Sequence, residues 1–485
     1  MFLDESPLSM DLWLRTLGLS SLSSLDGSEA AEEVMVPPFN SESRRGSATF
    51  SKAALVLTFL KNGWLGLPFV FERCGVAVTL LLLVILAIVT DQTMYIFWIC
   101  ARKTGANTYG GIVRVSYGFR VHCAIISILF LYLLLMVSQS MRSIHSIWTQ
   151  LFQHYLPDWS PPPVVFLWLP LAAVCKLDFH SLWFMVYTGI ICSLAVMIFF
   201  HFSDSNLDTQ KEEFNLLPMS LSDYWLGFNE LLISFVAIFN VLHLQAELKT
   251  PTTARMQSVV RESIIATSVL AFFIGKTGYD FFHRADSNAN IPENFLEHPF
   301  LLDSHFILKL ITFLAILFAL PLLLVPCRES LLDMIESLAL DGHCPSDISD
   351  CQDDVETWTT RSSSSMGNNH SNNLVVVNEE SGLLPSIEED KRCELNMNPY
   401  ARYGSNVAII ITSELLARNE LIVPRVWKVL APSLTLFLTF MVPASCYITL
   451  NRRDPQGYKI FGRWIIITSV VFSLVSTFVA VRCIF

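Results

Sequence analysis

Charged residues are scarce in this sequence. They make up 15% of its 485 residues, whereas a soluble domain has roughly 25%. Apolar residues account for 52%. This balance argues against an ordinary soluble enzyme and against a disordered chain, and the formal net charge of −11 argues against the basic surface that binds nucleic acid. The composition is typical of a protein that folds in lipid.

Paired cysteine spacings are also absent. The chain has 11 cysteines but no Cys-x-x-Cys sequence, and most of them lie in apolar runs or in one polar segment. We therefore expect no zinc or other metal site and no cofactor. No set of nucleophile and base stands out, so we do not expect an enzyme. Asp4 and Glu5 stand where a signal peptide has basic residues, so no signal peptide is predicted.

The acidic surplus is confined to one segment. Residues 327–401 contain 15 acidic and 4 basic side chains, and the rest of the chain is balanced. Runs of Ser and Asn without helical periodicity predict a disordered cytosolic loop, 327–402. Glu379, Leu383 and Leu384 fit an acidic dileucine sorting pattern. We expect sorting adaptors or signalling partners there, and a plasma or an endolysosomal (vacuolar) membrane as the location.

Eleven segments are candidates to cross a bilayer, which takes about 20 apolar residues each. The ninth contains Glu414, Arg418 and Glu420, but it must cross if the basic loop 451–463 is to stay on the cytosolic side with the N-terminus. The predicted organisation is a cytosolic tail (1–50), eight spans (51–326), the acidic loop (327–402) and three further spans (403–485). The segments are 52–70, 76–99, 121–140, 163–176, 182–202, 226–246, 263–283, 304–326, 405–424, 429–450 and 464–484.

The first span contains the clearest functional signal. Gly63, Gly66 and Pro68 fall within six positions, which predicts a break in the helix. In lipid, unwound backbone is tolerated where it is buried in protein or lines a cavity, and transporters bind substrates at such breaks. A simple kink or close helix packing is the alternative. Lys61, beside the break, can carry a proton, replace a bound cation, or pair with a structural carboxylate.

Two other spans carry polar residues. Asn240 and His243 lie one turn apart in the sixth span, where they can bind a substrate or another helix. Lys276 and Asp280 are four residues apart in the seventh, a spacing that predicts a structural ion pair.

Several motifs resemble the amino acid/auxin permease superfamily. The closest resemblance is to its neutral amino acid transporters and their lysosomal and proton-coupled relatives. It implies a LeuT-like core of two inverted five-helix repeats plus one helix, in an all-α membrane protein. The matching stretches occur in the family's order: Trp64-Leu-Gly-Leu-Pro-Phe-Val-Phe-Glu-Arg-Cys-Gly75, Glu247-Leu-Lys-Thr-Pro251, Gly275-x-x-Gly278-Tyr279, Leu320-Pro-Leu-Leu-Leu-Val-Pro326 and Val442-Pro-Ala-x-x-Tyr447.

Two departures from the family concern sodium. Sodium-coupled members place an Asn where this chain has Leu57, and a Thr or Ser where it has Ala319. Neither Leu nor Ala offers a side-chain oxygen to a hard cation. We therefore doubt sodium dependence at the usual site, and Lys61 points to proton coupling, uniport or loss of transport.

The resemblance and the residues together predict a secondary active transporter of small neutral amino acids. Its substrate would lie between the first and sixth spans, with its carboxylate on peptide amides of the first-span break and its amino group on carbonyls of the broken first and sixth spans. The alternative is an amino acid sensor or signalling scaffold on a transporter fold. Lys61 is the predicted coupling residue, and the predicted substrate-binding residues are Asn62, Gly63, Trp64, Gly66, Phe239 and Asn240.

Overall fold

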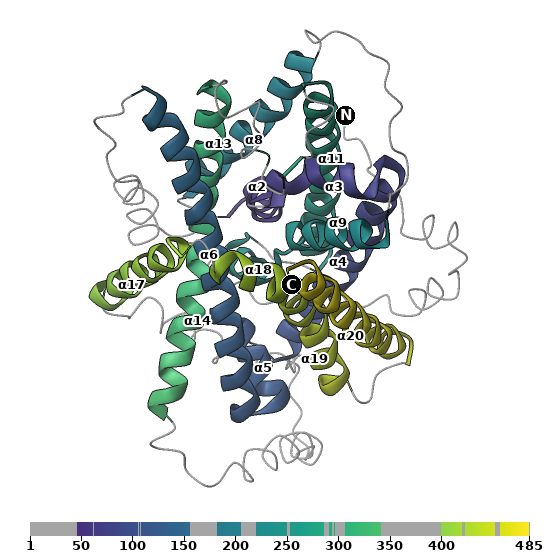
Figure 1. Cartoon of the computed structure of the whole chain (residues 1–485). Helices are drawn as coiled ribbons and strands as arrows, with labels where there is room; N and C mark the ends of the chain where they lie inside the picture. The colour runs from purple at the N-terminus through teal and green to yellow at the C-terminus, as the bar shows by residue number, and fades with distance from the viewer. Residues whose placement is uncertain are drawn as a thin grey trace, which may run out of the picture.

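The computed structural model describes the helical body of the chain (Figure 1). Among the described residues every element is a helix, and the β contact is one isolated bridge between Gly46 and Leu248. The described residues are 46–61, 63–104, 106, 108–155, 182–204, 220–249, 253–285, 291–292, 295, 306–340, 399–419, 422–451 and 456–484. The elements are α2 (Ala48–Leu60), η2 (Gly63–Gly66), α3 (Leu67–Cys74), α4 (Val76–Thr104), α5 (Tyr109–Tyr117), α6 (Phe119–Tyr155), α8 (Trp183–Asp204), α9 (Leu221–Ser234), α10 (Ile238–Glu247), α11 (Thr253–Ala285), α13 (Phe306–Ala319), α14 (Pro321–Leu340), α17 (Pro399–Ala417), α18 (Ile422–Thr435), η7 (Leu436–Met441), α19 (Val442–Leu450) and α20 (Gln456–Ile484).

The described helices account for nine of the eleven expected spans. Eight are long and apolar enough to cross a membrane, and the pair Ala48–Leu60 and Gly63–Cys74, bent by 49°, makes a ninth. The expected span 163–176 lies outside the described residues, as does most of the acidic loop. Helix α17 covers most of the expected ninth span but is not among the helices that qualify as spans. The membrane fold is thus confirmed, while the number eleven stays a prediction.

Several helices extend further than their apolar runs. Helix α14 continues to Leu340, so residues 327–340 are helical where the start of a disordered loop was expected. The third span was expected over 121–140, but α6 continues to Tyr155, because no glycine or proline interrupts it before Pro157. Similarly, α18 begins at Ile422, ahead of the expected start at 429. Arg142 and Lys428, which the sequence placed in loops, therefore lie on helices.

The first span is interrupted where the sequence predicted. Helix α2 ends at Leu60, a four-residue 3₁₀ turn covers Gly63–Gly66, and α3 then begins with Pro68 in its first turn. Pro is tolerated there because the first turn has no intrahelical use for its missing N–H. The break is therefore built into the local sequence.

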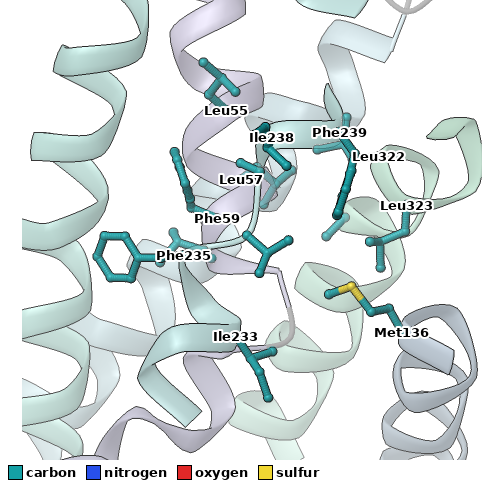
Figure 2. Packing of buried hydrophobic residues seen from close by; sticks show 14 of the residues in the cluster. Leu55, Leu57, Phe59, Met136, Ile233, Phe235, Ile238, Phe239, Leu322 and Leu323 are labelled. Atoms are coloured by element: carbon teal, nitrogen blue, oxygen red, sulfur yellow. The ribbon is translucent and has the colours of Figure 1, made fainter. Parts of the chain in front are cut away.

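The sixth span is interrupted as well, between α9 and α10. Phe235, Val236 and Ala237 separate the two helices. The two breaks touch, since a Cβ on Gly63 would lie 2.7 Å from Ser234 Cα and 2.0 Å from its Oγ. Figure 2 shows Leu57 and Phe59 of α2 beside Phe235 of the break and Ile238 at the start of α10.

Glycines let the second half of the first span, α3, pack closely. A Cβ on Gly275 of α11 would lie 2.4 Å from the Phe71 ring, and one on Gly278 would lie 2.6 Å from the Pro68 ring. Small residues allow such close approach between helices in membranes. The family-like Gly275-x-x-Gly278 pattern thus serves to pack α11 on α3.

The first and sixth spans are also joined at both ends. At one end, Gly46 N–H donates to the Glu247 carbonyl (2.9 Å) and Lys249 N–H donates to the Gly46 carbonyl (3.0 Å). At the other end, Arg73 Nη1 and Asp223 Oδ1 are 2.9 Å apart. The two spans are therefore held together at their ends as well as at their breaks.

Large apolar side chains remain exposed on the outer surface of the bundle, as expected for a surface that faces lipid. On α20 they recur at helical spacing: Ile460, Trp464, Ile467, Val471, Leu474 and Phe478.

Candidate substrate site

A cavity of about 160 Å³ opens beside the break in the first span. Its wall is formed by that break and by α6, α9 and α18. The lining residues are Lys61, Gly63, Leu65, Gly66, Met136, Gln139, Arg142, Ser143, Ser146, Glu230, Ile233, Pro424, Trp427 and Lys428.

The cavity reaches from the protein surface to the broken helix. Lys428 is exposed, whereas Lys61 is only 3% exposed. No residue in the described part of the chain forms a hydrogen bond or ion pair with the Lys61 side chain. A buried charge of this kind is costly without a partner, so Lys61 is a residue that a ligand can stabilise.

Helix α6 contributes a polar stripe to the wall. Gln139, Arg142, Ser143 and Ser146 line the cavity, and their spacing of three and four residues puts them on one helix face. Gln139 Oε1 and Arg142 Nη1 are buried and have no hydrogen-bond partner among the described residues. The sequence contained this stripe, but it fell at the end of the apolar run, where a loop was expected.

A column of aromatic rings leads away from the cavity. Trp427, on the cavity wall, stacks on Tyr132 of α6 (6.1 Å between ring centroids). Tyr132 contacts Phe239 of α10 (6.1 Å), and Phe239 contacts Tyr109 of α5 (5.6 Å). Both tyrosine hydroxyls are bonded, Tyr132 to Thr435 Oγ1 and Tyr109 to the Leu438 carbonyl (both 2.7 Å). The column therefore closes the cavity on that side.

The sequence matches the family described as transmembrane amino acid transporter protein over residues 44–484. The chain belongs to this family. The match confirms the resemblance to the amino acid/auxin permease superfamily, with which the two interrupted spans agree. The search of curated proteins found no match.

Solved transporter structures share the fold of this family member. A Na⁺-coupled sialic acid symporter in a substrate-bound outward-open state aligns with a TM-score of 0.53 at 10% identity, over 98% of this chain and 95% of that one. The nucleobase-cation-symport-1 family transporter Mhp1, in a closed conformation with bromovinylhydantoin bound, aligns with a TM-score of 0.55 at 10% identity. The alignment covers 93% of this chain and 95% of that one. At this identity the likeness concerns the fold, which is LeuT-like.

The transporter's predicted site residues fall into two groups. Lys61, Gly63 and Gly66 line the cavity together. Trp64 does not, because its ring is 2% exposed and packs against Phe295 (5.8 Å). Asn62 and the sorting residues lie outside the described part of the chain: Glu379, Leu383 and Leu384.

The remaining two predicted residues, Phe239 and Asn240, are not part of the cavity lining. Phe239 is part of the aromatic column. The Asn240 amide donates to Thr58 Oγ1 (3.2 Å) and to the Leu322 carbonyl (2.9 Å), while its Oδ1 has no hydrogen-bond partner among the described residues. Asn240 thus joins α10 to α2 and α14.

Two pairs of ionisable side chains connect or stabilise helices of the transporter. His243 Nε2 and Glu329 Oε2 are 2.8 Å apart and join α10 to α14. Lys276 and Asp280 form the predicted pair on α11, 2.5 Å apart. Both pairs lie outside the cavity lining.

The sodium-site positions of the family are apolar and buried here. Leu57 and Ala319 are 1% and 3% exposed, and Leu57 packs against the position of Gly189 on α8. In the described residues no group of three His, Cys, Asp or Glu side chains converges on a metal position.

Proposed function

We propose that this family member moves amino acids across a membrane by secondary active transport. The observation that carries the proposal is the contact of the two interrupted spans at Gly63 and Ser234, directly beside a cavity whose floor is buried. Interrupted helices of this kind expose peptide groups at the middle of the membrane, where a zwitterion can bind them.

The break offers peptide groups to both the carboxylate and the ammonium group of an amino acid. The free N–H groups at the start of η2 and α3, around Gly63 and Trp64, suit the carboxylate, with Asn62 as the adjoining residue. The carbonyls that end α2 and α9 carry partial negative charge and suit the ammonium group. Gly66 allows the backbone to approach the ligand closely.

Alternating access would follow from movement of the first and sixth spans as a unit. Helix α10 of this unit contacts α14 through Asn240 and His243, and Phe239 packs against Tyr109 and Tyr132. When these contacts separate, the side of the protein at α10 opens. The opposite movement closes the mouth of the cavity. The second and seventh spans would rock with the unit.

Several finer points belong to this proposal. The sequence resemblance favours a small neutral amino acid as substrate. Leu57 and Ala319 favour transport without sodium at the usual site, and buried Lys61 favours proton coupling. Basic loops favour a cytosolic N-terminus. The membrane would be the plasma membrane or an endolysosomal or vacuolar one.

The test is uptake of a panel of labelled amino acids by the purified full chain in proteoliposomes, with and without a pH gradient. We expect uptake of at least one amino acid, accelerated by the gradient. Absence of both binding and flux for the whole panel would overturn the proposal.

A second candidate function is an amino acid sensor on the same fold. It is favoured by Lys61, whose side chain lies where a transported ligand or ion would have to pass. Saturable amino acid binding without flux, together with a partner captured by residues 327–401, would support the sensor over the transporter.

A further inference from the structure

The charge of the cavity is unbalanced. Lys61, Arg142 and Lys428 line it with basic groups, whereas Glu230 is the acidic residue in its wall. A neutral amino acid carries one carboxylate and one ammonium group, so it leaves this excess positive charge in place.

Two of the basic groups have no partner among the residues that the structure describes. No carboxylate in the described residues lies within ion-pair distance of Lys61 or Arg142. Lys61 is 3% exposed, and Arg142 Nη1 is fully buried without a hydrogen-bond acceptor. A buried donor that stays unpaired costs free energy, and a carboxylate is the group that satisfies a guanidinium best.

We propose that the cavity binds a second carboxylate, on the side chain of an acidic amino acid. This inference rests on the proposed function and names its substrate class. The α-carboxylate would bind the peptide amides of the break near Gly63, with Lys61 beside it. The side-chain carboxylate would bind Arg142 on α6, and Glu230 on α9 lies on the wall that would receive the ammonium group.

The stripe on α6 suits this role. Ser143, one residue from Arg142, is 5% exposed, and Gln139 lies one turn earlier with its Oε1 buried and unpaired. An Arg held on a rigid helix between such polar groups can bind a carboxylate through two parallel hydrogen bonds. The substrate class therefore shifts from neutral, as the resemblance implied, to acidic.

The test compares glutamate with glutamine, which match in size and differ in charge. Purified full chain in proteoliposomes is assayed for binding and uptake of each labelled compound, in chloride and in gluconate buffer. We expect glutamate to bind at least about tenfold more tightly, since a hydrogen bond to a charged group has this magnitude. Arg142→Gln should remove the preference for glutamate over glutamine.

Two further variants serve as controls. Arg142→Lys keeps the charge and should keep the preference for glutamate. Arg463→Gln removes an exposed basic residue on α20, away from the cavity lining, and should alter neither affinity.

The outcomes separate the inference from the proposed function. Uptake of glutamine in preference to glutamate would overturn the inference and leave the transporter intact. Uptake of glutamine that requires chloride would also overturn it, because a free anion would then fill the basic site. Failure to bind or move either compound or any other amino acid would overturn the proposed function itself.

Discussion

Gly63 is the residue on which the site depends most directly. It brings the unwound part of the first span against Ser234 at the end of α9, where a Cβ has no room. The same contact positions the neighbouring peptide groups at the cavity.

We predict that Gly63→Ala abolishes uptake and destabilises the protein by about 1–3 kcal/mol, the usual cost of overpacking. The added methyl group would lie 2.0 Å from Ser234 Oγ and 2.7 Å from its Cα, so the backbone itself must move. Uptake and thermal unfolding measure the two effects. Gly404→Ala is the matched control, because its Cβ would meet nothing within 4 Å, and it should be neutral or slightly stabilising. Full activity of Gly63→Ala would contradict the predicted role of this contact.

At the residue scale, the sequence predicted those site residues that a pattern of neighbouring residues marks. Glycine and proline spacing marked Gly63, Gly66 and Pro68, and polarity within an apolar run marked Lys61. The orientation of Trp64 toward Phe295 was not predictable, because a side chain on a short 3₁₀ turn is directed by its tertiary neighbours. Arg142 was missed since hydropathy alone ended the third span at residue 140.

In the proposed transport cycle, helices α10 and α14 form the contact that closes one side of the molecule. Asn240 and His243, one turn apart on α10, bond to the Leu322 carbonyl and to Glu329 on α14. This pair of contacts holds α10 against α14.

We predict that Glu329→Gln loosens the contact between α10 and α14 and raises the population of the state open on that side. Cys327, buried at 0% exposure two residues away, provides the probe. In a variant that keeps only this cysteine, its labelling by a permeant maleimide should accelerate several-fold. Glu414→Gln, which breaks the Glu414–Arg418 pair on α17, is the control and should leave labelling unchanged. Unchanged labelling in Glu329→Gln would refute a closing role for the His243 pair.

The family resemblance implied a break in the sixth span, but no local pattern in the sequence marked its position. Phe235, Val236 and Ala237 include no glycine or proline, so local propensity gives no reason for the helix to stop. We attribute the interruption to the contact of Ser234 with Gly63 and to packing around Phe235. The Phe235 ring packs against the Phe59 ring, with 6.0 Å between the ring centroids. Such long-range causes become visible only in the folded chain.

The whole molecule combines a LeuT-like fold with apolar residues at the family's sodium positions. Composition and apolar runs were sufficient to predict the all-helical membrane class. The ordered motifs were sufficient to predict the family, which the match over residues 44–484 confirms.

We predict that transport does not depend on sodium. Leu57 and Ala319 are buried and present no side-chain oxygen, and a hard cation needs oxygen ligands. Replacing sodium by choline in the uptake assay should leave the rate unchanged within error. A rate that falls at least tenfold in choline would show that a cation site exists elsewhere.

We further predict that Leu383→Ala with Leu384→Ala moves the full-length protein from endolysosomal membranes toward the cell surface. The reason is loss of the acidic dileucine pattern that begins at Glu379. Surface biotinylation of the tagged chain measures the change, with Leu374→Ala in the same loop as the control. An unaltered distribution would show that the pattern is not a sorting signal.

The column from Trp427 through Tyr132 and Phe239 to Tyr109 has a kinetic consequence. In the proposed transport cycle, these four rings from four different elements must part before a solute can pass, and they then lose much of their contact. Entry into the cavity needs no such disruption. Turnover should therefore be governed by a large activation enthalpy, so that warming accelerates the complete cycle far more steeply than it accelerates ligand capture.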